Sequence, residues 1–149
     1  MHIVRANAEH LDVLVILFDQ YRQFYGRQGD LGGVTRFLGE RLERQDSIIF
    51  LALNEKSQAM GFSQLYPSFS SVSMKRLWIL NDLFVSPDFR RLGVAKALMQ
   101  QAKKFAQDTK AKGIVLETEV ANTTARPLYE QLGYRRDENF LHYALTLEL

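Results

Sequence analysis

The segment Phe84–Met99, with the sequence FVSPDFRRLGVAKALM, constrains the fold more than any other part of this chain. An apolar, strand-like stretch ends at a proline, and an amphipathic helix begins after two arginines and the small residues Gly93 and Ala95. A second dense apolar segment, Ile114–Val120, follows this helix. A strand, a helix and a strand in this order form a right-handed crossover, which pairs the two strands in parallel. We therefore predict that Trp78–Val85 and Ile114–Val120 are parallel neighbours in one sheet.

The apolar pattern over the rest of the chain predicts a mixed sheet of the α/β (α+β) class, with helices on both faces. The expected strands are His2–Arg5, Ser47–Asn54, Ala59–Phe69, Arg76–Val85 and Ile114–Val120, with strands closing the chain, the last at Asn139–Leu149. The expected helices are Ala8–Tyr25, capped by Asn7, then Val34–Arg44, Leu92–Lys110, and a short helix from near Thr123 to the left-handed cap Gly133. The element order is βααβββαβαββ. No repeat, linker or low-complexity tract interrupts it, so we expect a single domain over residues 1–149.

Composition limits the class of function. The chain has 149 residues and 46% hydrophobic content, enough for one domain to bury a core without disulfides or metals. Its formal charge of +2 is too balanced for a surface that binds nucleic acid as a whole. There is no cysteine, which excludes a disulfide framework, a thiolate metal site and a cysteine nucleophile. Because no signal core or long apolar run is present, we expect a cytoplasmic protein without a membrane partner.

The junction before the long helix has the properties of a phosphate site. Backbone N–H groups at a helix N-terminus have no partners within the helix and carry the positive end of its dipole. Small residues such as Gly93 and Ala95 let a phosphate approach this backbone closely. Spacing excludes two familiar phosphate loops, because the sequence contains neither GxxxxGKS/T nor GxGxxG. Close packing of the helix on the sheet is the alternative explanation for the two small residues.

Arg90–Ala95 (RRLGVA) matches the pattern Gln/Arg-x-x-Gly-x-Gly/Ala, and here the chain resembles the GCN5-related N-acetyltransferase (GNAT) superfamily. The resemblance extends from the strand LNDLFV through VSPDFRRLGVAKALM to NTTARPLYEQLGY, and the element order agrees over the whole chain. The sequence is most similar to the small fungal acetyltransferases of histones and D-amino acids and to their bacterial relatives. The resemblance implies the GNAT fold, with a splayed pair of central parallel strands, and acetyl-coenzyme A as the co-substrate.

The resemblance also implies a coenzyme A site built from three segments. The N–H groups of residues 91–96 would hold the pyrophosphate, and a bulge in Asn81–Val85 would free the backbone of that strand for the pantetheine arm. Asn122 would contact the pantetheine, with a helix N-cap role as the alternative, and Arg126 would lie near the phosphates or the adenine. Arg91 departs from the commonest family form, which often has glycine there. The expected cofactor-binding residues are Leu83, Phe84, Val85, Arg90, Arg91, Leu92, Gly93, Val94, Ala95, Lys96, Asn122, Arg126 and Tyr129.

Acetyl transfer to an amine requires a neutral nitrogen, attack on a thioester carbonyl and a proton for the departing thiolate. The resemblance assigns the last role to Tyr129, for which packing in an apolar cluster is the alternative. The base is left open between Asp82 and Glu117, because a carboxylate on a buried strand is costly unless it is paired or functional. The candidate acceptor-binding residues are Tyr21, Tyr25 and Asn81. Aromatic residues at this helical spacing also fit a core.

These features predict an acetyl-coenzyme A dependent N-acetyltransferase that transfers acetyl directly to a primary amine of an amino acid, a polyamine or a peptide. Two alternatives stay open: a transferase of a longer acyl group, and a non-catalytic module that senses coenzyme A. No metal is expected, because the three histidines are scattered along the chain. Alternating apolar residues in Leu141–Leu149 predict a homodimer through the last strand, with an ordinary sheet edge as the alternative.

Overall fold

The computed structural model describes residues 1–148, which fall into two compact units, Met1–Glu117 and the residues from Thr118 onward. The strands of the first unit are β1 (His2–Arg5), β2 (Ile48–Leu53), β3 (Ala59–Ser70), β4 (Lys75–Val85) and β5 (Gly113–Val115). Its helices are α1 (Leu11–Phe24), α2 (Leu31–Arg44) and α3 (Val94–Asp108), with short 3-10 turns at Ala8–His10 and Pro87–Phe89. The second unit contains α4 (Arg126–Gln131). None of these helices has the length and apolar composition needed to cross a membrane.

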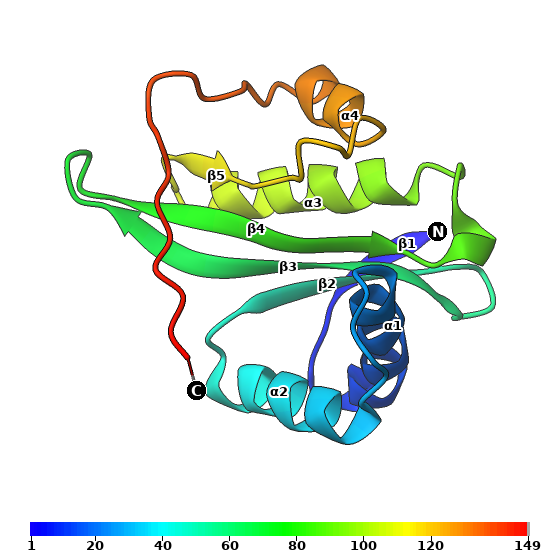
Figure 1. Cartoon of the computed structure of the whole chain (residues 1–149). Helices are drawn as coiled ribbons and strands as arrows, with labels where there is room; N and C mark the ends of the chain where they lie inside the picture. The colour runs from blue at the N-terminus through cyan, green and yellow to red at the C-terminus, as the bar shows by residue number, and fades with distance from the viewer. Residues whose placement is uncertain (149) are drawn as a thin grey trace. The chain divides into compact units, whose positions relative to one another are not determined.

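The strands of the first unit form one mixed sheet in the order β1-β2-β3-β4-β5 (Figure 1). Neighbours from β1 to β4 are antiparallel, and the crossover through α3 returns the chain parallel to β4. This confirms the mixed sheet and the parallel pair that the sequence predicts. The parallel pairing covers only Leu77–Ile79 and Gly113–Val115. Within the described residues, the second half of β4 therefore has no strand beside it on that edge.

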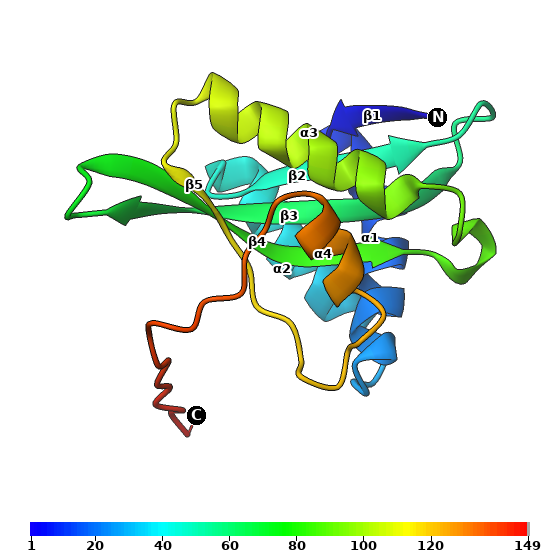
Figure 2. The same ribbon diagram turned by 90° about the horizontal axis from the view of Figure 1, so that it is seen from above.

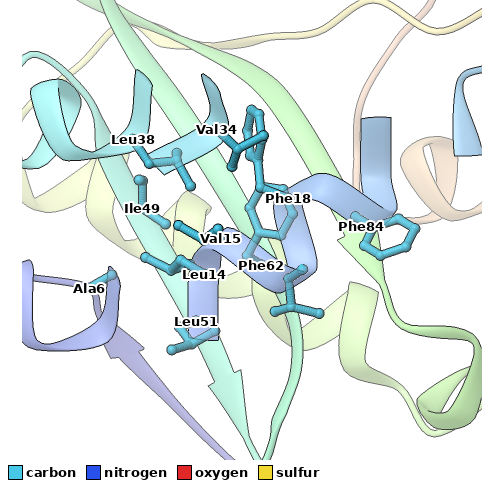
Figure 3. Close-up of a cluster of buried hydrophobic side chains, with 11 residues drawn as sticks. Ala6, Leu14, Val15, Phe18, Val34, Leu38, Ile49, Leu51, Phe62 and Phe84 are labelled. Carbon is cyan, nitrogen blue, oxygen red and sulfur yellow. The ribbon is translucent and has the colours of Figure 1, made fainter. Parts of the chain in front are cut away.

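Helices cover both faces of this sheet, with α3 on one face and α1 and α2 on the other (Figures 1 and 2). Because both faces are covered, Ile48–Ala52 of β2 is buried at every position. Between the sheet and the pair α1 and α2 lies a cluster of buried side chains that includes Leu14, Phe18, Leu38 and Phe62 (Figure 3). Burying a side chain of this kind contributes about 1.5–3 kcal/mol to folding, so this cluster is a main source of stability.

Asp19 joins the end of α1 to the start of α2. Its side chain is buried, and its Oδ1 accepts the backbone N–H of Asp30 at 2.8 Å. Asp30 in turn caps α2, because its Oδ1 accepts the N–H of Gly33 at 2.9 Å. The helix consequently begins at Leu31, before the predicted start at Val34, since this cap offsets the low helix propensity of the glycines in its first turn.

In the second unit, α4 ends at a residue with the left-handed conformation that the sequence predicts. Gly133 has a φ of 95°, and its N–H donates to the carbonyl of Glu130 at 3.1 Å. The N–H of Tyr134 donates to the carbonyl of Tyr129 at 3.0 Å. Together these bonds form a Schellman motif, which satisfies carbonyl groups that the end of a helix leaves without partners.

Two predicted strands differ from the structure. The strand expected over Ile114–Val120 ends at Val115, and residues 139–148 contain no strand, while Leu149 lies outside the described residues. Alternating apolar residues favour a strand, but a strand also needs a neighbour to supply hydrogen-bond partners. Leu141, Tyr143 and Leu145 instead expose 83%, 89% and 87% of their surface. The observed order therefore lacks the closing strands of the predicted order.

Candidate active site

A bulge interrupts β4 where its parallel pairing with β5 has ended. Gln64 of β3 pairs with Asp82 and the next residue, Leu65, pairs with Leu80, so Asn81 is an extra residue in β4. Side chains normally alternate between the two faces of a sheet, and one extra residue shifts this alternation by one step. The bulge and the loss of the parallel neighbour give the splayed strand that the resemblance implies.

Contacts on either side of the bulge show its effect on side-chain direction. Before it, Trp78 lies on the α3 face, where its ring centroid is 5.0 Å from that of Phe105. After it, Phe84 lies on the α1 face, with its ring centroid 5.8 Å from that of Tyr21. Strict alternation would have placed Trp78 and Phe84 on one face. The bulge therefore turns Asp82 toward α1 as well.

Asp82 is a buried carboxylate held by three neutral donors. Its Oδ1 accepts the Tyr21 hydroxyl at 2.8 Å and Asn81 Nδ2 at 3.1 Å, and its Oδ2 accepts Gln64 Nε2 at 2.7 Å. The Ser47 hydroxyl donates to Gln64 Oε1 at 2.8 Å, which orients the amide with its nitrogen toward Asp82. Within residues 1–148, no cation forms an ion pair with this carboxylate. These hydrogen bonds offset part of the cost of burying its charge.

Tyr21 lies between this carboxylate and a group of aromatic rings. Its ring centroid is 5.2 Å from that of Tyr25, and it also contacts Phe18, Phe62 and Phe84. Burial, followed by the charge of Asp82, raises the pKa of Tyr21 well above its ordinary value. The phenol therefore keeps its proton and donates it in the hydrogen bond. Tyr25, a predicted acceptor residue, is 51% exposed beside it.

A surface hollow of about 380 Å³ lies on the face of β3 that also carries Gln64. Its lining residues are Phe37, Arg41, Asp46, Tyr66 and Pro67. Tyr66 follows Gln64 by two residues in β3, so both side chains lie on one face. Arg41 Nε donates to Asp46 Oδ1 at 2.7 Å, which leaves the charged groups of the hollow mutually paired. Because Gln64 pairs with Asp82, Tyr66 and the hollow lie near that carboxylate; burial, followed by the charge of Asp82, raises the pKa of Tyr66 to about 12.

Arg90 lies at the end of β4. Its Nε donates to the carbonyl of Val85 at 3.2 Å, and its guanidinium is 5.4 Å from the ring centroid of Phe24 and 5.9 Å from that of Phe84. The structure thus turns this predicted phosphate ligand toward the strand and α1. Its charge still lies at the junction between β4 and the loop that leads to α3.

The N-terminus of α3 fits a pyrophosphate. Gly93 precedes the helix at a φ of 80°, and no side chain caps the first turn. Nothing lies within 4 Å of the position that a Cβ of Gly93 would take, so the space over the loop is open. Arg91 and Lys96 are exposed, and neither forms an ion pair in the part of the chain that the structure describes. Free N–H groups and two unpaired cations suit a doubly charged ligand.

The other residues predicted to bind coenzyme A between β4 and α3 differ in their burial. Leu83 and Val85 are partly buried in the splayed half of β4, and Phe84 is buried. Leu92 is 62% exposed in the loop, whereas Val94 is buried and anchors the first turn of α3. Ala95 is partly buried. All of these residues lie in the first unit, and their roles toward coenzyme A stay predictions.

Asn122, Arg126 and Tyr129 lie in the second unit. Asn122 Nδ2 donates to the Thr118 hydroxyl at 3.3 Å. The N-cap of α4 is Ala125, so the alternative reading of Asn122 as the helix N-cap is wrong. Arg126 is the first residue of α4, and Tyr129 follows one turn later, partly buried. The roles of these three residues toward coenzyme A stay predictions.

Glu117 lies in different surroundings from the other candidate base, Asp82. Since β5 ends at Val115, Glu117 follows the strand and is exposed. The expectation of a carboxylate on a buried strand is therefore wrong for Glu117, because the strand is shorter than its apolar pattern predicts. Asp82 satisfies the same expectation, at 5% exposure.

Gln64, Ser47 and Tyr66 are part of this site but are not among the residues predicted from the sequence. Gln64 did carry a signal, because it is a polar residue next to the apolar Leu65 in a strand that is buried from Met60 to Leu65. A polar residue in such a run needs a hydrogen-bond partner. Ser47 carried no signal, since it begins the predicted strand Ser47–Asn54 and meets Gln64 only in the folded chain.

Comparisons with known proteins agree on one family. The Acetyltransferase (GNAT) family matches residues 14–134. The chain is 47% identical over 147 residues to the uncharacterized N-acetyltransferase YhfO of Bacillus subtilis, covering 99% of this chain and 98% of that protein. The crystal structure of a probable acetyltransferase superposes with a TM-score of 0.95 at 46% identity, covering 99% of both chains. A more distant relative is the thialysine N-epsilon-acetyltransferase of Caenorhabditis elegans, 27% identical over 89% of this chain and 81% of that protein.

Proposed function

This chain belongs to the acetyltransferase (GNAT) family, and we propose that it moves the acetyl group of acetyl-coenzyme A directly to a primary amine of a small molecule or a peptide. Membership of the family makes the chain an N-acetyltransferase with acetyl-coenzyme A as the implied co-substrate. One observation carries the finer proposal. The first unit combines an uncapped helix N-terminus that fits a pyrophosphate with a buried carboxylate on the splayed half of β4.

The donor would lie along the segment from β4 to α3. The N–H groups at the start of α3 would bind the pyrophosphate, and Arg91 and Lys96 would add charge there. The edge of β4 beyond Ile79 has no strand beside it within residues 1–148, so its backbone groups could bond the pantetheine amides as an added strand would. Gly93 permits this path, because its φ of 80° is strained for any residue with a side chain.

The reaction would proceed in a complex of both substrates. The acceptor nitrogen attacks the thioester carbonyl, a C–N bond forms, and the C–S bond breaks with its electron pair on sulfur. Asp82 would take up the proton that the nitrogen loses, and its burial against α1 distinguishes it from the exposed Glu117. Tyr129 would give its hydroxyl proton to the thiolate. Because the chain has no cysteine, no acetyl-cysteine intermediate can form, and this favours direct attack.

We favour an amino acid or a polyamine over a peptide as the acceptor. The hollow beside Tyr66 has a volume of about 380 Å³, suited to a small molecule, and its charged groups are already paired. The name of the thialysine relative describes transfer to the terminal amine of an amino-acid side chain. Tyr21 and Asn81 donate hydrogen bonds to Asp82 and Tyr25 borders Tyr21, so we place the primary amine near these three residues. A longer acyl donor and a non-catalytic role in sensing coenzyme A are the competing functions.

We also propose that residues 1–149 act as one GNAT domain and that two copies associate. The exposed apolar side chains of Leu141, Tyr143 and Leu145 support association, because contiguous exposed apolar residues mark contact surfaces.

The test is release of free thiol from acetyl-coenzyme A in the presence of single amines. The panel contains amino acids of both hands, polyamines and basic peptides, with hexanoyl-coenzyme A as a parallel donor. We expect release that depends on the acceptor and on the acetyl donor. Tight binding of coenzyme A by calorimetry without release on any acceptor would support the sensing function instead. Faster release from the hexanoyl donor would support the longer acyl group.

A further inference from the structure

Asp82 is placed where an acceptor nitrogen cannot reach it directly. The residue is 5% exposed, and both of its oxygens already accept hydrogen bonds. A carboxylate can accept about four hydrogen bonds, and three donors occupy it here. A base must lie within hydrogen-bond distance of the proton it removes, either directly or through one intermediate group. The three donors are the groups already within hydrogen-bond distance of Asp82 that could pass a proton to it.

Gln64 and Asn81 are unsuitable as that intermediate group. Both donate amide N–H groups, and an amide nitrogen does not accept a proton near neutral pH. Gln64 is also fully buried, and its other end accepts the Ser47 hydroxyl at 2.8 Å. Gln64 and Ser47 thus hold the carboxylate in place, and we assign them a positioning role.

Tyr21 has the chemistry that the other two donors lack. Its hydroxyl donates to Asp82 Oδ1 at 2.8 Å and keeps lone pairs that can accept a proton from another group. Contacts with Phe18, Phe62 and Phe84 fix the ring. The ring is partly exposed and borders Tyr25, which is 51% exposed, so the Tyr21 side of the carboxylate leads toward solvent.

We propose that the Tyr21 hydroxyl relays the proton of the acceptor amine to Asp82. When the nitrogen has attacked the thioester carbonyl, its N–H bond breaks and a new O–H bond forms on Tyr21. In the same step the original hydroxyl proton of Tyr21 passes to Asp82 Oδ1, so that Tyr21 stays neutral and the carboxylate becomes a carboxylic acid. Asp82 later returns its proton to water by the reverse path. The relay rests on the proposed function, because it supplies the base for that reaction.

The test compares three variants of the full chain with the parent protein on an acceptor that the thiol-release panel identifies. Tyr21→Phe keeps the ring and removes the hydroxyl, Asp82→Asn removes the base, and the double variant removes both. We expect each single variant to lower kcat about 100-fold, with the KM for acetyl-coenzyme A changed by less than about threefold. The double variant should lose no more than the worse single variant, because both changes interrupt one proton path. Ser71→Ala is the control, since it removes an exposed hydroxyl in the turn between β3 and β4 and should retain parental kcat.

Two outcomes would overturn the relay and leave the proposed function intact. One is a Tyr21→Phe protein with parental kcat, and the other is a double variant whose losses multiply. A parent protein that releases no thiol with any amine would overturn the proposed function together with the relay. If Tyr21→Phe fails to fold, the relay is tested by the turnover rate of the parent protein in mixtures of light and heavy water. Two protons in flight give a curved dependence on the deuterium fraction, and a linear dependence would overturn the relay.

Discussion

Gly93 is the residue on which the proposed phosphate site depends most directly. Its φ of 80° sets the path of the loop into α3, and the space over it is open. A side chain there would stand where the pyrophosphate is expected, and a carboxylate would add repulsion to the steric block. Substitutions at Gly93 therefore test the proposed donor site directly.

We predict that Gly93→Asp weakens acetyl-coenzyme A binding by at least about tenfold in calorimetry, because like charges then oppose each other at the helix N-terminus. Gly93→Ala is the matched control, since it imposes the same strain of about 1 kcal/mol at positive φ without the charge. It should bind more tightly than Gly93→Asp. If Gly93→Asp and the parent bound acetyl-coenzyme A with equal affinity, the pyrophosphate would not lie at this loop.

Tyr66 gives a prediction for alkaline pH. Burial, followed by the charge of Asp82, raises its pKa from 10.0 to about 12, so the folded protein keeps a proton that the unfolded chain loses. Its contribution to stability is therefore complete below pH 10 and declines as the pH rises toward about 12. Tyr66→Phe should show a shallower fall in the free energy of unfolding over this window, measured by urea denaturation. An identical slope in both proteins would mean that Tyr66 ionises normally in the folded state.

At the scale of elements, the bulge in β4 was beyond what periodicity can predict. The sequence placed the strand correctly, and its apolar residues at Trp78, Leu80 and Phe84 alternate as they would in a regular strand. The reversal of faces at Asn81 becomes visible only through pairing with β3. The short β5 and the missing closing strands have a similar cause, because strand pairing depends on a neighbour as well as on the segment itself.

We predict that deletion of Asn81 leaves the protein folded and that Asn81→Ala leaves the melting temperature within a few degrees of the parent. Leu80 and Asp82 pair with the consecutive residues Leu65 and Gln64, so deletion makes β4 a regular strand and keeps Asp82 and Phe84 on the α1 face. The substitution removes one exposed side chain and its 3.1 Å hydrogen bond to Asp82. Circular dichroism of both variants checks this. A deletion variant that does not fold would show that the fold needs the bulge for more than the direction of these side chains.

At the scale of the whole molecule, the sequence predicted the family, the mixed sheet and the parallel crossover, because these depend on local patterns such as RRLGVA and the strand–helix–strand order. The donor site over this segment stays a prediction. The network of Asp82, Gln64 and Ser47 joins residues far apart in the chain, so only the folded structure assembles it. The same applies to the hollow beside Tyr66.

The exposed apolar residues near the C-terminus lead to a prediction about assembly. We expect Leu145→Asp to shift the protein from dimer to monomer in light scattering, because it places a charge in a proposed apolar contact. Glu148→Lys is the control, since it changes charge in the same segment at a position without an apolar side chain. If light scattering gave the same molecular mass in solution for the parent and for Leu145→Asp, this would argue against association through this segment.

Direct acetyl transfer is tested most directly by following the acetyl group itself. Acetyl-coenzyme A with a deuterated acetyl methyl group is incubated with the protein and its best acceptor, and the masses of acceptor and protein are followed through the first turnovers. We predict that the label appears on the acceptor nitrogen while the mass of the protein stays unchanged. A labelled protein that forms and decays as fast as turnover, or an acceptor that never gains the label, would contradict it.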